Sequence, residues 1–354
     1  MAGGRVVAVA ASAAVAVAAY YYLRRKRARE LAATFERDGI AVVRGFASVS
    51  ECQQMLRAMD VLVEEWDPTT TTSVFKTDST QTSAQGKDDY FMSSGDAVRT
   101  TWQPLRAARA CSEPHALATA QVRFFLEAGA MDEQTGDLLV PKTEALNKVG
   151  HALHVYEPAF AQYAQSGKMR ALVHELGWKR PDLVQSMYIF KQPRIGGEVT
   201  PHQDSCFLRT DPHSCLGLWL ALEDATLDNG CLWARPGSHL EPLRRHFAKQ
   251  PDGTMGFEPQ LSTDAAASTP AMAWEGRMPE GQTPESLGFV ALPVRAGDLV
   301  LIHGQVDHLS LPNTSGKSRH TFQLHLVESK AAGATWHARN WLQYPQAKPF
   351  PQFM

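Results

Sequence analysis

The residues most suited to chemistry are a histidine and an aspartate two positions apart, His202 and Asp204. On an extended backbone alternate side chains point to the same side, so these two can bind one ion while Gln203 points elsewhere. His308, which ends the segment 298–308, is the best candidate for a third ligand, whereas His303 is expected to be structural. Two histidines and one carboxylate are typical of the facial triad of non-haem Fe(II) oxygenases, which leaves metal positions open for reactants. Because His-x-Asp recurs by chance, polar surface residues are the alternative interpretation.

A basic residue downstream of these ligands indicates an anion site. Arg319 lies in the segment 317–327, whose alternation of side-chain types predicts a strand. An arginine there can form a two-pronged salt bridge with a carboxylate, and Ser310, at the same side-chain parity as His308, can add a hydroxyl. A metal beside such a clamp can hold 2-oxoglutarate, with the keto-acid end on iron and the far carboxylate on Arg319. A surface arginine that closes a sheet edge is the alternative.

Five sequence blocks carry a resemblance to a known family. The blocks are residues 147–154, 185–192, 196–204, 223–233 and 235–239. Through them the chain resembles the phytanoyl-CoA dioxygenase family, and the similarity begins at Phe35 and runs to the C-terminus.

The resemblance implies a set of site residues. Its iron ligands are His202, Asp204 and His308, in agreement with the spacing argument. Its contacts to 2-oxoglutarate are Lys148, Met187, Gln203, Trp219, Ser310 and Arg319. Considered without the resemblance, Lys148 is expected to be a solvated lysine, and Met187 and Trp219 are expected to be core side chains.

The resemblance also implies an activity. It implies an enzyme that uses Fe(II), 2-oxoglutarate and O₂ to hydroxylate a small organic substrate, such as a fatty acyl-CoA or another lipid. Two other classes stay open on the residues alone. One is a zinc hydrolase that uses the same three ligands. The other is a membrane-tethered jelly-roll protein that binds or senses a ligand without turnover.

The composition excludes one class of partner. With 35 basic and 37 acidic residues, the net charge is −2, so we expect no nucleic-acid-binding surface. The five cysteines include no Cys-x-x-Cys pair and predict no disulfide framework. The chain is long enough for a substantial core, but its composition does not indicate an oligomeric state.

The N-terminus differs in composition from the rest of the chain. Residues 6–23 carry no charge, and residues 24–29 are strongly basic. An apolar helix of this length nearly crosses a bilayer core of about 30 Å. We therefore expect residues 1–30 to anchor the protein in a membrane, with a catalytic domain of residues 31–354 in the cytosol. A targeting peptide that is cleaved in an organelle is the alternative.

Short apolar runs separated by glycine and proline turns predict a mainly β fold with flanking helices. The expected architecture is a double-stranded β-helix, or jelly roll, of the cupin type. The runs are residues 40–46, 184–190, 216–222, 231–233 and 298–302. Asn229-Gly230 predicts a hairpin between the third and fourth runs, and Ser48 or Ser50 is expected to cap a helix.

Three further segments are expected to be loops or insertions. They are residues 69–85, 100–121 and 244–287. The third is long for a compact domain, which favours either a lid that faces the substrate or a plain surface insertion.

Overall fold

The computed structural model describes residues 22, 25–71, 73–74, 122–132, 134–260, 278–343 and 350–353. The expected insertion at 100–121 and most of the expected loop at 69–85 lie outside these residues.

The central element is a large antiparallel sheet. In the part of the chain that the structure describes, it has seven strands in the order β1-β12-β7-β14-β4-β3-β2. Its strands in chain order are β1 (Ile40–Val43), β2 (Arg123–Leu126), β3 (Leu146–His151), β4 (Pro181–Ile189), β7 (Leu216–Ala221), β12 (Leu299–His303) and β14 (Thr321–Glu328). Four of the five apolar runs predicted from the sequence, residues 40–46, 184–190, 216–222 and 298–302, lie on these strands. β7 is buried along its whole length and β12 up to His303, as near-continuous hydrophobicity requires.

A smaller antiparallel sheet lies against one face of the large one. Among the described residues its order is β11-β8-β13-β5. Its strands are β5 (Val199–His202), β8 (Leu232–Ala234), β11 (Val290–Leu292) and β13 (His308–Ser310). Leu232 and Leu309 of this sheet share one buried cluster with Trp219, Val300 and Ile302 of the large sheet. The expected mainly β fold with antiparallel sheets is confirmed.

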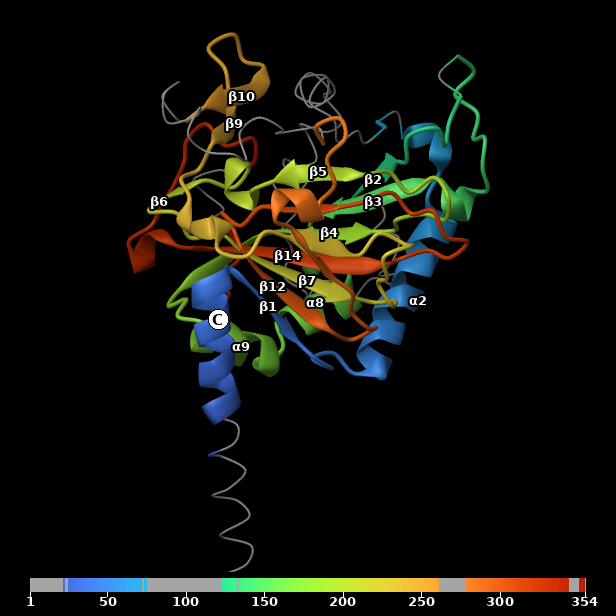
Figure 1. Cartoon of the computed structure of the whole chain (residues 1–354). Coiled ribbons are helices and arrows are strands. Elements are labelled where there is room, and N and C mark those ends of the chain that lie inside the picture. Colours follow the sequence, from blue (N-terminus) through green and yellow to red (C-terminus); the bar gives the residue numbers. More distant parts are fainter. Residues whose placement is uncertain are drawn as a thin grey trace, which may run out of the picture.

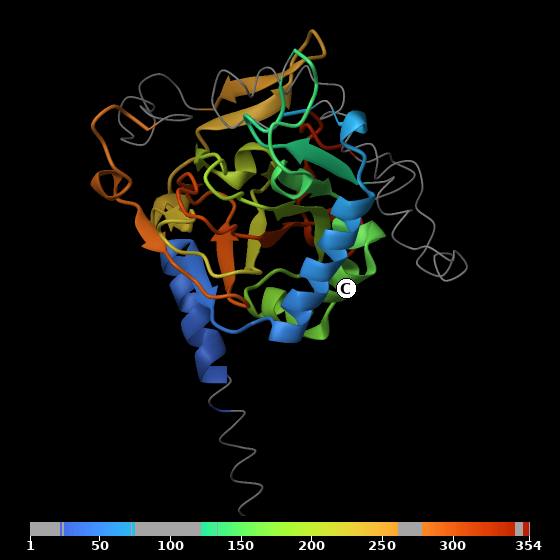
Figure 2. The ribbon, with the colours of Figure 1, turned by 90° about the vertical axis from the view of Figure 1, so that its right-hand side faces the viewer.

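Helices cover the other face of the large sheet. They are α2 (Val49–Glu65), α7 (Leu153–Tyr156), α8 (Pro158–Ala164) and α9 (Gly167–Glu175), and α2 crosses the front of the molecule in Figure 2. Ser48 caps α2 as predicted, in a capping box with Glu51. Met55, Met59 and Leu62 of α2 belong to the same buried cluster as the outward-facing strand residues. The helices therefore bury the outer face and leave the space between the two sheets for a site.

A hairpin stands at one end of the strands. It pairs β9 (Arg245–Lys249) with β10 (Met255–Pro259) and projects at the top of Figure 1. It falls in the segment 244–287, which was expected to be a loop, so that expectation is wrong for these residues; residues 261–277 lie outside the description. Short strands β6 (Thr210–Asp211) and β15 (Thr335–Trp336) form a further pair nearby.

The predicted hairpin at Asn229-Gly230 is wrong. β7 and β8, which it was expected to join, belong to different sheets. Asn229 instead closes a turn between the sheets, because its amide oxygen accepts from Thr226 N at 2.7 Å and its amide nitrogen donates to Asp224 O at 2.8 Å. The left-handed backbone of Gly230, with φ +82°, suits this turn as well as it suits a hairpin, so the dipeptide alone cannot distinguish them.

The predicted membrane anchor is contradicted. Within the described residues, no helix is both long enough and apolar enough to span a bilayer. The prediction depended on residues 6–23, an alanine-rich run at the short limit for a span, and apart from Tyr22 this run lies outside the description. The predicted location, a membrane anchor with the catalytic domain in the cytosol, is therefore withdrawn.

A metal centre beside a buried anion pocket

Three side chains, carried by two neighbouring strands and by the turn after one of them, converge between the sheets. His202 ends β5 and His308 begins β13, and these two residues are register partners in the antiparallel pair. Asp204 does not continue the strand, as the alternation argument assumed, but opens the 3₁₀ turn Asp204–Cys206. The turn still brings the carboxylate to the histidines, so the predicted set is brought together.

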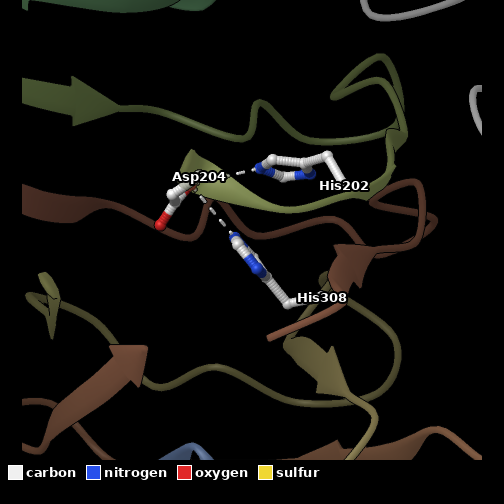
Figure 3. Close-up of side chains that lie close together, drawn as sticks. All are labelled: His202, Asp204 and His308. Carbon is white, nitrogen blue, oxygen red and sulfur yellow. Dashed lines mark ion pairs between the residues drawn. The ribbon is translucent and has the colours of Figure 1, made fainter. Parts of the chain in front are cut away.

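The ligand atoms of the three residues face one another. One ligand atom from each lies within 4.8 Å of those of the other two, and Figure 3 shows both imidazoles directed at the Asp204 carboxylate. Oδ1 of Asp204 lies 3.5 Å from Nε2 of His202 and 3.6 Å from Nε2 of His308. His303 lies apart from this group and packs on His239 and Phe35, as its expected structural role requires.

The protonation pattern of the two histidines suits a cation. Nδ1 of His202 lies 2.8 Å from Thr200 O, and Nδ1 of His308 lies 3.1 Å from Val306 O. A carbonyl oxygen only accepts, so each Nδ1 carries the proton and each Nε2 presents a lone pair. Burial lowers the pKa of His308 to about 4, which keeps its ring neutral at neutral pH.

The Asp204 carboxylate is charged. Burial raises its pKa, but His308 and the other nearby imidazoles, which are protonated at the acidic pH where Asp204 would titrate, lower it by more and hold the pKa well below the usual range. A carboxylate oxygen and two imidazole lone pairs therefore point at one another without a proton between them, an arrangement that repels unless a cation lies at the centre. This donor set fits a divalent metal, and nitrogen and oxygen ligands of this kind suit iron or zinc.

The triad opens into a cavity of about 180 Å³ between the sheets. Its wall combines apolar side chains with a few polar ones, which is usual for a small-molecule site. Five of the six residues implied to contact 2-oxoglutarate line it: Lys148, Met187, Trp219, Ser310 and Arg319.

Arg319 is the clearest anion-binding group in the cavity. It is 1% exposed, and its guanidinium lies 5.2 Å from the centre of the Trp219 ring. Its Nη1 makes a long 3.4 Å contact with Thr321 Oγ1, its Nε has no hydrogen-bond partner, and no carboxylate of the described residues forms an ion pair with it. Burial lowers its pKa to about 10, so it remains charged at neutral pH. A buried charge without a partner is costly, and an anionic ligand would supply the missing one.

Two buried lysines lie at or beside the cavity wall. Lys191 donates from Nζ to Ser310 Oγ at 2.9 Å and to Gly197 O, which fixes the serine oxygen and leaves its hydroxyl proton for a ligand. Lys148 was expected to be solvated when considered alone, but it is 4% exposed, and its burial holds its pKa well below the usual range. Trp219 is a core side chain, as expected, whereas Met187 is only partly buried, and both form part of the cavity wall.

Gln203 does not line the cavity. Its Nε2 donates to Gln305 O at 2.9 Å, and its Oε1 accepts from Arg244 N at 3.3 Å. The side chain therefore ties the turn that carries Asp204 to the loop that precedes His308. The implied contact between Gln203 and 2-oxoglutarate stays a prediction.

Sequence reasoning missed several residues of this site. His325 was not among the predicted site residues, yet its Nε2 lies 3.3 Å from Asp204 Oδ2. Gln185 contacts His325, and Lys191 holds Ser310. A signal was present for His325, because it shares its side-chain parity with Arg319 along the strand that the sequence predicts over residues 317–327. For Lys191 the sequence contains no comparable signal.

These observations define a class of protein. A mainly β fold that brings two histidines and a carboxylate beside a buried, unpaired arginine is suited to a non-haem iron enzyme that uses a dicarboxylic keto acid. The phytanoyl-CoA dioxygenase (PhyH) family profile matches residues 35–321 of the chain. The chain therefore belongs to the phytanoyl-CoA dioxygenase family. It is an enzyme that depends on iron and 2-oxoglutarate, and the resemblance stated from the sequence is confirmed.

Individual relatives agree with this family. Phytanoyl-CoA dioxygenase domain-containing protein 1 of Mus musculus is 42% identical over 320 residues, which cover 90% of this chain and 95% of that protein. A phytanoyl-CoA dioxygenase of Arabidopsis thaliana is 38% identical over 309 residues, covering 87% and 91%. The crystal structure of the non-heme alpha ketoglutarate dependent carbocyclase SnoK from nogalamycin biosynthesis has a TM-score of 0.55 at 16% identity, over 92% of this chain and 96% of that one. At this identity the solved structure shows a shared fold.

Proposed function

We propose that this dioxygenase hydroxylates a small apolar organic substrate and that its iron ligands are His202, Asp204 and His308. The observation that carries the proposal is the unpaired, buried guanidinium of Arg319 in the same cavity as the three ligands. A zinc hydrolase would need the three metal ligands but not Arg319. A cosubstrate with a carboxylate at each end would bind the metal through one end and Arg319 through the other.

The roles of the pocket residues follow from their positions. Arg319 would bind the far carboxylate of 2-oxoglutarate, and Ser310, whose oxygen is held by Lys191, would donate its hydroxyl proton to the same group. Trp219 and Met187 would enclose the carbon chain, and Lys148 would add a positive or hydrogen-bonding group to the wall. Gln203 would act indirectly, because its side chain links the turn that carries Asp204 to the loop that precedes His308.

The metal and cosubstrate would supply oxidising chemistry, in which 2-oxoglutarate and O₂ yield succinate and CO₂ while one oxygen atom enters a substrate C–H bond. The protein supplies geometry and a dry environment. The side chains of Ile189, Leu218, Leu232 and Ile302 line the cavity and exclude water from it. A carboxylate at position 204 also disfavours a halogenase, in which a small residue stands there.

The substrate end of the cavity favours an apolar molecule. Phe207, Phe247 and Phe257 line it and pack on one another with ring centres 5.2 to 5.7 Å apart. Arg245 lies over the Phe257 ring at 3.8 Å and gives this wall one positive group. A fatty acyl-CoA or another lipid with an acidic group suits these features and agrees with the names of the relatives. We also propose that residues 31–354 form the dioxygenase domain.

Activity assays with a panel of substrates test this proposal. Purified protein with Fe(II) and ascorbate is given 2-oxoglutarate, and succinate and O₂ consumption are measured with fatty acids, acyl-CoA esters, and polar controls of equal chain length. We expect apolar, acidic compounds to stimulate succinate formation. Stimulation by polar controls alone, or zinc-dependent hydrolysis without succinate, would contradict it.

A matched pair of histidine variants tests the ligand assignment. His308→Ala should lose iron and turnover, whereas His303→Ala, a substitution on the same segment, should retain both. Circular dichroism confirms that each variant folds. Loss of iron from His303→Ala alone would show that the third ligand is misassigned.

A further inference from the structure

A row of side chains crosses the large sheet beneath the Asp204 carboxylate. In the strand register, Gln185 of β4 lies opposite His325 of β14, and His325 lies opposite Gly217 of β7. At Gly217 a Cβ would stand 3.0 Å from Asp204 Oδ2. The absence of a side chain at Gly217 therefore leaves space for the Asp204 carboxylate. His325 is the neighbour of Gly217 in the same row.

The two carboxylate oxygens of Asp204 have different surroundings. Oδ1 faces Nε2 of His202 and Nε2 of His308, at 3.5 and 3.6 Å. Oδ2 faces Nε2 of His325 at 3.3 Å, a separation typical of an ion pair and long for a hydrogen bond. One oxygen thus faces the metal position, and the other faces the sheet.

The tautomer of His325 follows from its other contact. Nε2 of Gln185 lies 3.1 Å from Nδ1 of His325. An amide NH₂ only donates, so Nδ1 accepts, and in the neutral ring the proton is on Nε2, where it points at Asp204. With the amide turned over, Nδ1 would carry the proton, and the Nε2 lone pair would face the carboxylate at 3.3 Å. That arrangement is repulsive, so the contacts favour the first one.

We propose that His325, oriented by Gln185, is a positioning residue that donates its Nε2 proton to Oδ2 of Asp204 and so leaves Oδ1 as the single oxygen for the metal. This inference rests on the proposed function, because it assumes that Asp204 is a metal ligand. A carboxylate held on one oxygen binds a metal through the other and cannot rotate to close an open position. Partners of this kind typically contribute 10- to 100-fold, roughly, to metal affinity.

Metal affinity tests the proposal without relying on turnover. Fe(II) binding is measured anaerobically by competition with a coloured chelator, for the wild type and for His325→Leu, His325→Gln and His154→Leu. His154 is a buried imidazole bound to Ser186, so its variant controls for loss of a buried ring. We expect His325→Leu to weaken Fe(II) binding about 10- to 100-fold. His325→Gln should recover most of this loss, because a glutamine amide can donate from nearly the same place.

The possible results separate this inference from the proposed function. Equal Fe(II) affinity of the wild type and His325→Leu overturns the inference alone, and so does an equal loss in both His325 variants, which would indicate packing. Absence of Fe(II) binding in the wild type overturns the proposed function and the inference together. Nitrogen-15 spectra of the zinc-loaded wild type provide an independent test. We expect a protonated Nε2 and a bare Nδ1 at His325, and the opposite tautomer overturns the proposal.

Discussion

Replacement of Arg319 should separate cosubstrate binding from folding. The guanidinium is buried, carries its charge at neutral pH, and has one weak hydrogen bond to Thr321 and no ion pair among the described residues. A bidentate salt bridge with a carboxylate adds two charge-assisted hydrogen bonds, each about 1.5–3 kcal/mol. Lysine keeps the charge but can make only part of that contact, so Arg319→Lys should lose about 1.5–3 kcal/mol, or roughly 10- to 150-fold in 2-oxoglutarate affinity.

Arg319→Met should not lower the thermal stability of the protein in the absence of cosubstrate. An unpaired buried charge destabilises the fold, so an apolar side chain of similar length should leave the melting temperature unchanged or raise it. The increase in melting temperature that 2-oxoglutarate causes in the wild type should disappear in this variant.

Calorimetric titration and thermal unfolding, each with and without 2-oxoglutarate, measure both effects in the zinc-loaded protein. Arg295→Lys, on an exposed arginine, serves as the control and should behave as the wild type. Undiminished 2-oxoglutarate affinity in Arg319→Lys and Arg319→Met would refute the reasoning and direct attention to Lys148.

Three further outcomes follow from the structure. Gly217→Ala places a methyl group 3.0 Å from Asp204 Oδ2. Chelator competition should therefore show that Fe(II) affinity is reduced roughly tenfold or more. Unchanged Fe(II) affinity would mean that the carboxylate moves freely. Lys191→Met removes the donor to Ser310, so the KM for 2-oxoglutarate should rise more than kcat falls. Denaturant unfolding should show that the free energy of unfolding is lower by about 1–3 kcal/mol. A fall in kcat alone would contradict the role of Lys191 in holding Ser310. Burial lowers the pKa of His154 to about 3 from 6.5, so below pH 6.5 the unfolded chain binds a proton that the folded chain does not. Stability is therefore present above pH 6.5 and falls toward pH 3, by at most about 1.4 kcal/mol per pH unit through this residue, and His154→Asn should show a shallower fall in denaturant titrations at pH 7 and pH 5.

The sequence predicted the ligands better than it predicted their backbone. His202 and Asp204 were identifiable because their residue types suit a metal and they lie in a family block, residues 196–204, and His308 completed a known set of two histidines and one carboxylate. The 3₁₀ turn at Asp204 was not predictable, since an alternating pattern and a strand that ends at His202 look alike over three residues. Convergence of the ligands depends on the β5–β13 pairing, which sequence spacing does not encode.

The errors have physical causes. Asn229-Gly230 has the φ preferences of a hairpin, but long-range pairing of β7 with β12 and β14 decided which sheet each strand joined. The β9–β10 hairpin was missed because polar and glycine residues dominate the segment around it. Lys148 was interpreted as solvated because lysine usually is, and only the three-dimensional cavity shows it buried.

The source of the oxygen in succinate tests the central claim most directly. The wild type is incubated with Fe(II), 2-oxoglutarate and ¹⁸O₂, and the succinate is analysed by mass spectrometry, with Asp204→Ala as the control. An iron-dependent dioxygenase with this site should produce succinate that contains one ¹⁸O atom, and Asp204→Ala should produce none. Unlabelled succinate from the wild type, no succinate at all, or undiminished labelling in Asp204→Ala would contradict the account.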